Sequence, residues 1–180
     1  MRVISGSLRG RKLLAPQGFD IRPTTDKVKE SAFNIIQFQV PGARVLDLFA
    51  GSGQLGVEAV SRGAEFVTFV EKDEASLKIL YKNTEILPDG SFEIVKSDAL
   101  YFLKNLPESR RFDIVFADPP YDTSLLDRVA DDLSKRDFVA PGGTVVCESR
   151  ADKALPELEG FAKREFRYGV IKLTVYKKSS

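Results

Sequence analysis

The sequence predicts an α/β fold with a seven-stranded, mostly parallel sheet that ends in an antiparallel hairpin. Three observations lead to this prediction. Short strand-like runs alternate with helix-like runs through the middle of the chain, a glycine-rich turn follows the first of these strands, and two longer strand-like runs close the chain. Strands that alternate with helices of about 10–15 residues are typical of a doubly wound parallel sheet.

The predicted parallel strands are short runs rich in β-branched and aromatic residues: Arg44–Phe49, Phe66–Glu71, Phe92–Lys96, Phe112–Asp118 and Thr144–Ser149. Apolar residues at helical spacing predict the intervening helices: Gln54–Arg62, Glu74–Glu85, Ala99–Asn105 and Ser124–Arg136. An extra amphipathic helix is expected ahead of the sheet, over Asp26–Gln39.

The two ends of the chain differ from this pattern. Phe161–Tyr168 and Val170–Lys177 flank Gly169 too closely for a crossover helix, so they predict an antiparallel hairpin at the sheet edge. At the start, Gly6 and Gly10 lie between apolar pairs and predict a small basic β-hairpin outside the sheet. We expect one domain over residues 1–180, divided into a hairpin extension (1–20), a lead-in helix (21–42) and a core (43–180).

The composition excludes several kinds of chemistry. The chain has 180 residues, no histidine and one cysteine, so histidine bases, Ser-His-Asp triads and thiolate or histidine metal sites are not expected. Cys147 lies in a predicted buried strand and is expected to be a core residue. The start lacks a signal peptide and no run is long enough to span a membrane, so a cytoplasmic protein without a membrane partner is expected.

Charge is distributed unevenly along the chain. Residues 1–14 carry four basic residues and no acid, residues 163–180 carry six basic residues and one acid, and the remainder has 17 basic and 25 acidic residues. The net charges of +4, +5 and −8 sum to +1. Basic ends on an acidic body indicate a polyanionic partner.

Four acidic residues end four successive predicted strands: Asp47, Glu71, Asp98 and Asp118. After the first of them, Gly51, Gly53 and Gly56 fit the spacing of a nucleotide-binding turn, which alone allows either NAD or S-adenosylmethionine. A carboxylate at Asp47 would repel a dinucleotide pyrophosphate and attract the ammonium group of S-adenosylmethionine. Glu71 is placed to hold ribose hydroxyls, and Asp98 and the Ala99 backbone to hold an adenine ring.

The segment Asp118-Pro119-Pro120-Tyr121 leaves the fourth predicted strand rigidly, because proline has no N–H for the sheet. The Asp118 carboxylate and a proline carbonyl can accept the two hydrogens of an exocyclic amine, and the Tyr121 ring can stack on the base that carries it. These features predict an acceptor site for a planar amine.

These motifs resemble those of class I S-adenosylmethionine-dependent methyltransferases, which have a Rossmann-like sheet. Two further segments, Ile4–Leu13 and Ile21–Glu30, resemble the bacterial family that methylates N2 of a guanine in 16S ribosomal RNA. The resemblance implies catalytic roles for Asp118, Pro119 and Tyr121. It implies cofactor contacts from Asp47, Phe49, Ala50, Gly51, Gly53, Glu71, Lys72, Asp98, Ala99 and Asp118. It implies RNA contacts from Arg9, Arg11, Lys12, Arg22, Pro23, Thr24 and Thr25.

The reaction that this resemblance implies is direct attack of guanine N2 on the cofactor's methyl group, in 16S rRNA that is free or within an assembling small subunit. A monomer is expected. Alternatives are an adenine-N6 methyltransferase, a protein glutamine-N5 methyltransferase, and a non-enzymatic RNA-binding assembly factor. Asp47 and the terminal hairpin disfavour a dehydrogenase.

Overall fold

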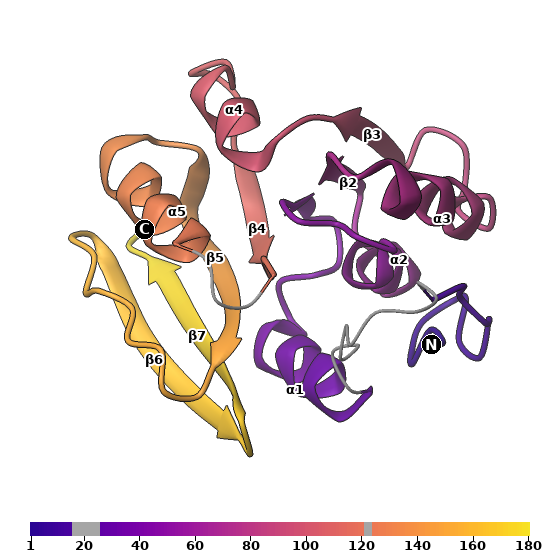
Figure 1. Cartoon of the computed structure of the whole chain (residues 1–180), viewed down its shortest axis with the longest axis horizontal. Coiled ribbons are helices and arrows are strands. Elements are labelled where there is room, and N and C mark those ends of the chain that lie inside the picture. Colours follow the sequence, from indigo (N-terminus) through magenta and orange to yellow (C-terminus); the bar gives the residue numbers. More distant parts are fainter. Residues whose placement is uncertain (16–25, 121–123) are drawn as a thin grey trace.

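The computed structural model describes residues 1–15, 26–120 and 124–180, in which helices and strands alternate until three consecutive strands close the chain (Figure 1). The helices are α1 (Asp26–Ile36), α2 (Gln54–Ser61), α3 (Glu74–Thr84), α4 (Ala99–Lys104) and α5 (Leu125–Lys135). The strands are β1 (Arg44–Asp47), β2 (Phe66–Glu71), β3 (Phe92–Lys96), β4 (Phe112–Ala117), β5 (Val139–Arg150), β6 (Phe161–Tyr168) and β7 (Ile171–Lys178).

All of these strands form one sheet in the order β3-β2-β1-β4-β5-β7-β6. Strands β1 to β5 pair in parallel, and β7 is antiparallel to both of its neighbours, β5 and β6. Strand β6 therefore runs in the same direction as β1–β5, and β7 is the single reversed strand of this sheet. The predicted mostly parallel sheet with an antiparallel C-terminal hairpin is confirmed.

Strand β5 is longer than the predicted run Thr144–Ser149. It begins at Val139 and continues through Pro141 and two glycines, residues that favour turns. The register between β4 and β5 shifts between Phe112 and Ile114, and this irregularity accommodates the extra residues. The strand then pairs with β7 from Thr144 to Arg150.

The helices cover the two faces of the sheet separately. Side chains from α1, α2 and α3, such as Phe33, Val57 and Leu80, share one apolar cluster with Val45 of β1. Side chains from α4 and α5 share a second cluster with Leu46, the next residue of the same strand. Because successive strand residues point to opposite faces, these clusters are the two layers of a helix-sheet-helix sandwich.

Residues 1–14, called here the N-terminal arm, lie beside α2 and outside the main sheet (Figure 1). The predicted hairpin is reduced to one antiparallel bridge between Arg2 and Lys12. The Val3 N–H donates to the Arg11 carbonyl and the Leu13 N–H to the Met1 carbonyl. Turns occupy the middle of the arm, where Gly6 and Gly10 have φ values of 84° and 83°.

Among the described residues, no helix combines the length and the apolar character needed to cross a lipid bilayer.

Candidate functional site

The site lies where the strand order reverses. From β1 the chain continues outward through β2 to β3, and then returns to β4 on the other side of β1. The Leu48 N–H donates to the Phe116 carbonyl at 3.0 Å, so the segments that leave β1 and β4 lie together. Open α/β sheets bind ligands at this reversal, beyond the carboxyl ends of the strands.

Asp47 ends β1 and is 2% exposed. Its Oδ2 accepts a hydrogen bond of 3.0 Å from the N–H of Gly56 in α2, which ties the strand end to the helix across the intervening turn. Burial raises the pKa of Asp47 to about 7, with the Gly56 hydrogen bond acting in the opposite direction and the nearby Glu71 raising it slightly. The predicted carboxylate is therefore present and enclosed beneath the glycine turn.

The glycines of the turn are required by its geometry. Gly51 and Gly53 have φ values of 54° and 79°, a region that side chains with a Cβ disfavour. At Gly56 a Cβ would lie 2.1 Å from Cε1 of Phe69, so helix α2 can approach β2 this closely only without a side chain. The turn presents bare backbone to the crevice.

Glu71 ends β2 and connects it to the same turn. Its Oε2 accepts the Gly51 N–H at 2.7 Å, while its Oε1 accepts the N–H groups of Lys72 and Asp73, both at 2.8 Å. Asp73 in turn is the N-cap of α3, as its side chain accepts the Ser76 N–H. The acid predicted to hold ribose thus also fixes the backbone on both sides of the crevice.

Asp98 is the N-cap of α4 and uses one of its two carboxylate oxygens to cap the helix. Its Oδ1 accepts the N–H groups of Leu100 and Tyr101, and its Oδ2 lies 2.9 Å from Nζ of Lys72. The Lys72 hydrogen bond is the main reason that the pKa of Asp98 is lowered. The structure brings Asp98 and Lys72, both predicted cofactor residues, together across the β2 and β3 ends.

The remaining predicted cofactor residues lie on the same edge. Ala50 is buried in the turn, and Ala99 is buried at the first position of α4. Phe49 is half-buried and packs against the second apolar cluster.

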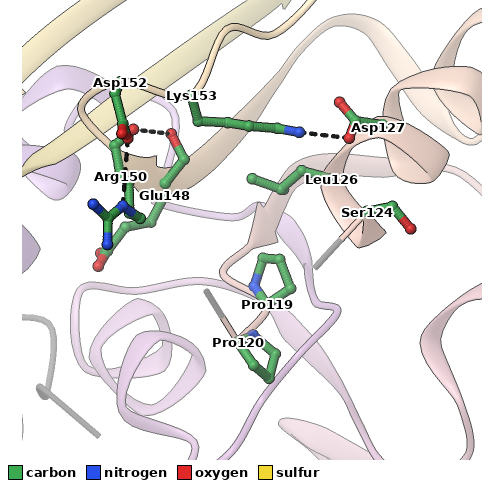
Figure 2. Close-up of a pocket in the computed structure, with 10 residues that line it drawn as sticks. Pro119, Pro120, Ser124, Leu126, Asp127, Glu148, Arg150, Asp152 and Lys153 are labelled. Carbon is green, nitrogen blue, oxygen red and sulfur yellow. Dashed lines mark hydrogen bonds and ion pairs between the residues drawn. The ribbon is translucent and has the colours of Figure 1, made fainter. Parts of the chain in front are cut away.

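The predicted acceptor segment follows β4. Asp118 is half-buried, Pro119 is buried and Pro120 is exposed, whereas Tyr121 lies outside the described residues. Beside the two prolines is a hollow of about 480 Å³ (Figure 2). Its other lining residues come from the start of α5 and from the end of β5 and the loop that follows: Ser124, Leu126, Asp127, Glu148, Ser149, Arg150, Asp152 and Lys153.

The predicted RNA-binding residues fall into two groups. Arg9, Arg11 and Lys12 are exposed on the N-terminal arm. Arg22, Pro23, Thr24 and Thr25 lie outside the described residues.

The arm is attached to the core through a buried acid that the sequence did not single out. Glu58 of α2 is fully buried, and its two oxygens accept the N–H groups of Ile4 and Ser5 at 2.7 and 3.0 Å. Lys29 and Arg62 lie 3.7 and 2.7 Å from the same carboxylate. Burial lowers the pKa of Lys29. The arm is therefore an integral part of the fold.

A second attachment joins the arm to the glycine turn after β1. The Asn83 carboxamide accepts the Leu14 N–H at 2.8 Å and donates to the Leu14 carbonyl at 3.0 Å. It also donates to the Ser52 carbonyl at 2.8 Å, within the glycine turn. Glu58 and Asn83 are polar residues inside amphipathic helices, and nothing in their spacing distinguishes them from surface residues.

Glu148 and the lining residues of the hollow that come from α5 and from the loop after β5 are also absent from the predicted site. A usable signal existed for Glu148, because it is an acid near the carboxyl end of a strand, as Asp47, Glu71 and Asp118 are. Cys147, next to it, is a core residue as expected: it is buried, and burial raises the pKa of its thiol to about 12.

The strand order with one reversed strand, together with a glycine turn after β1, defines the Rossmann-like fold of class I methyltransferases. Structural comparison agrees. The solved structure of yhhF from Escherichia coli superimposes with a TM-score of 0.88 at 36% identity, over 99% of this chain and 98% of that one.

The family follows from sequence comparison. A family model described as Conserved hypothetical protein 95 matches residues 1–177. Ribosomal RNA small subunit methyltransferase D from Escherichia coli is 40% identical over 87% of this chain and 78% of its own length. The protein of that name from Haemophilus influenzae is 36% identical over 98% and 93%. The chain belongs to this family, which confirms the resemblance seen in the sequence.

Proposed function

We propose that the protein transfers a methyl group from S-adenosylmethionine to the exocyclic N2 of a guanine in 16S ribosomal RNA. One observation carries the proposal: the glycine turn after β1 and the Asp118–Pro120 segment after β4 leave neighbouring strands at one point of the sheet. A cofactor turn and an amine acceptor are thereby adjacent. The names of the relatives from Escherichia coli and Haemophilus influenzae support ribosomal RNA as the substrate class.

The residues around the crevice fit S-adenosylmethionine. The bare backbone at Gly51 and Gly53 allows close approach of a ligand, and the buried Asp47 carboxylate suits a cationic amino-acid tail. Glu71 and Asp98 are the proposed partners of the ribose hydroxyls and the adenine amine. When bound, the cofactor supplies an electrophilic methyl group.

The acceptor side is proposed to orient the amine. The guanine N2 lone pair is delocalised into the ring, so positioning is expected to contribute much of the rate enhancement. The Asp118 carboxylate and the Pro119 carbonyl accept the two amine hydrogens, and Tyr121 stacks on the extruded base. Asp118 then accepts the proton that leaves N2 or passes it to water.

Binding of the RNA is assigned to the exposed cations of the arm and to residues Arg22 to Thr25. Arg9, Arg11 and Lys12 offer only a few phosphate contacts, and this number is small for tight binding to free RNA. We therefore propose the assembled or assembling small subunit as the substrate, bound by a monomer of this protein in the cytoplasm.

Transfer of a labelled methyl group to small subunits, free 16S rRNA, DNA and protein, followed by nucleoside and amino-acid analysis, tests the proposal. The expected product is N2-methylguanine, formed faster on subunits than on free rRNA. Labelled N6-methyladenine or methylglutamine as the product would overturn it.

Asp118→Ala tests the acceptor assignment. A loss of about 100-fold or more in kcat/KM is expected, because both an orienting and a proton-accepting group are removed. The matched control is Asp89→Ala, which removes an exposed acid from a turn and is expected to leave activity unchanged. Near wild-type turnover by a folded Asp118→Ala variant would contradict the assignment.

A further inference from the structure

Glu148 stands next to the acceptor segment on the neighbouring strand. β4 and β5 are parallel, and Ala117 pairs with Cys147, so residues 118 and 148 follow one step further along the two strands. Neighbouring strands are about 4.8 Å apart, which brings the two acids within reach of one base. Val146 packs in the first apolar cluster and Cys147 in the second, so the Glu148 side chain is on the face that carries α1, α2 and α3.

Glu148 also lines the 480 Å³ hollow together with Pro119 and Pro120 (Figure 2). This volume falls within the range of about 300–1,000 Å³ that ligand pockets occupy. Glu148 is 5% exposed, so a group that meets its carboxylate would be largely removed from water.

We propose that the Glu148 carboxylate accepts the N1–H of the target base and thereby selects guanine. The inference rests on the proposed function, in which Asp118 and Pro119 already engage both hydrogens of the amine. In guanine, N1–H is the ring donor directly beside the carbon that bears this amine. A carboxylate has only acceptor oxygens, so it matches this donor without competing for the amine hydrogens.

The same carboxylate rejects bases that lack this donor. Adenine places an unprotonated N1 beside its exocyclic amine, and its lone pair would face the carboxylate oxygens. A site that is built to receive a donor discriminates strongly against an analogue without one, because its buried polar group is left unpaired. Glu148 would therefore account for guanine N2, rather than adenine N6, as the methylated position.

2-Aminopurine isolates this contact, because it keeps the 2-amino group of guanine but has an unprotonated N1. Once the methylated guanine is mapped, 16S rRNA with 2-aminopurine at that position can be made by ligation and reconstituted into subunits. We expect the wild-type protein to prefer guanine over 2-aminopurine by about 100-fold in kcat/KM.

Glu148→Gln should reduce this preference to below about 10-fold, because an amide can accept from the N1–H of guanine or donate to the bare N1 of 2-aminopurine. Glu148→Asp keeps a carboxylate, so it should slow both substrates while retaining the preference for guanine. The second variant, checked by its melting temperature, keeps the test usable if Glu148→Gln does not fold.

Asp152→Asn is the matched control, since it removes one negative charge from the same hollow at an exposed side chain. It should leave the guanine to 2-aminopurine ratio unchanged. An unchanged ratio in Glu148→Gln, with N2-methylguanine still formed by the wild type, would overturn the role of Glu148 alone. Absence of N2-methylguanine from the wild-type reaction would overturn the proposed function itself.

Discussion

The site has two sides, which meet where the strand order reverses between β1 and β4. The proposed cofactor side and the proposed acceptor side are held by different kinds of contact. On the cofactor side, Asp47, Glu71 and Asp98 all accept hydrogen bonds from backbone N–H groups of the adjoining turns and helices. On the acceptor side, two prolines have no N–H to donate, and four charged residues of the hollow form two side-chain ion pairs, Arg150 with Asp152 and Lys153 with Asp127.

Because of this difference, we expect substitutions on the two sides to change different properties of the protein. A carboxylate that holds backbone fixes the shape of a turn, so its substitution changes stability and ligand binding together. A side-chain ion pair at a partly exposed hollow contributes little to stability, and its substitution leaves the backbone in place. We therefore expect substitutions on the cofactor side to lower the stability of the protein. Substitutions on the acceptor side should instead change its activity and its selectivity.

The largest effect on stability is expected for Asp47→Asn, as a function of pH. Burial raises the pKa of Asp47 to about 7 from its usual 3.8, so between these values the folded protein holds a proton that the unfolded chain releases. Wild-type stability relative to the Asn variant should therefore fall as pH rises from about 4 to about 7, by up to about 4 kcal/mol, and stay constant above this range.

Urea unfolding of both proteins at pH values from 4.5 to 8 measures this difference. If the free energies of unfolding of the two proteins changed in parallel with pH, Asp47 would titrate normally. The burial of its carboxylate at the end of β1 would then be contradicted.

An intermediate effect is expected for Gly56→Ala. The added Cβ would lie 2.1 Å from the Phe69 ring, which is fully buried, so the strain of overpacking of about 1–3 kcal/mol should exceed the gain in helix propensity of about 1 kcal/mol. Combining it with Phe69→Leu should recover part of the loss. A double-mutant cycle by chemical denaturation measures the coupling, and additive effects would contradict the close approach of α2 to β2.

The smallest effect is expected on the acceptor side, for Lys153→Gln. The Lys153 and Asp127 side chains are 33% and 47% exposed, so loss of their ion pair should lower the free energy of unfolding by less than about 1 kcal/mol. Thermal unfolding at low and high salt checks this value. A loss comparable to that of Gly56→Ala would remove the contrast between the two sides.

The sheet and the cofactor side could be predicted from the sequence because their signals are local. Strands β2, β3 and β6 have the predicted bounds. Acids at strand ends and a glycine turn can be located from a few neighbouring residues in the sequence. The extension of β5 to Val139 was missed, because a Pro-Gly-Gly segment favours a turn unless neighbouring strands hold it in a bulge.

The contacts that hold the N-terminal arm against helices α2 and α3 could not be predicted, since each joins residues that are distant in sequence. Glu58 meets Ile4 across 54 positions, and Asn83 meets Leu14 across 69. A charged residue in a helix is exposed by default, and only the folded arrangement shows that Glu58 is enclosed by Lys29, Arg62 and the arm. Glu148 is different, because its place near a strand end was visible in the sequence, but its place beside Asp118 is set by strand pairing.

The buried carboxylate of Glu58 also fixes an order of events during synthesis of the chain. Ile4 and Ser5 are made before their hydrogen-bond acceptor, Glu58, which follows them by 54 and 53 residues. Until α2 has emerged and packed, the cations of the arm have no fixed position. The newly made protein therefore gains an ordered arm only after the first strand and helix of its core have formed.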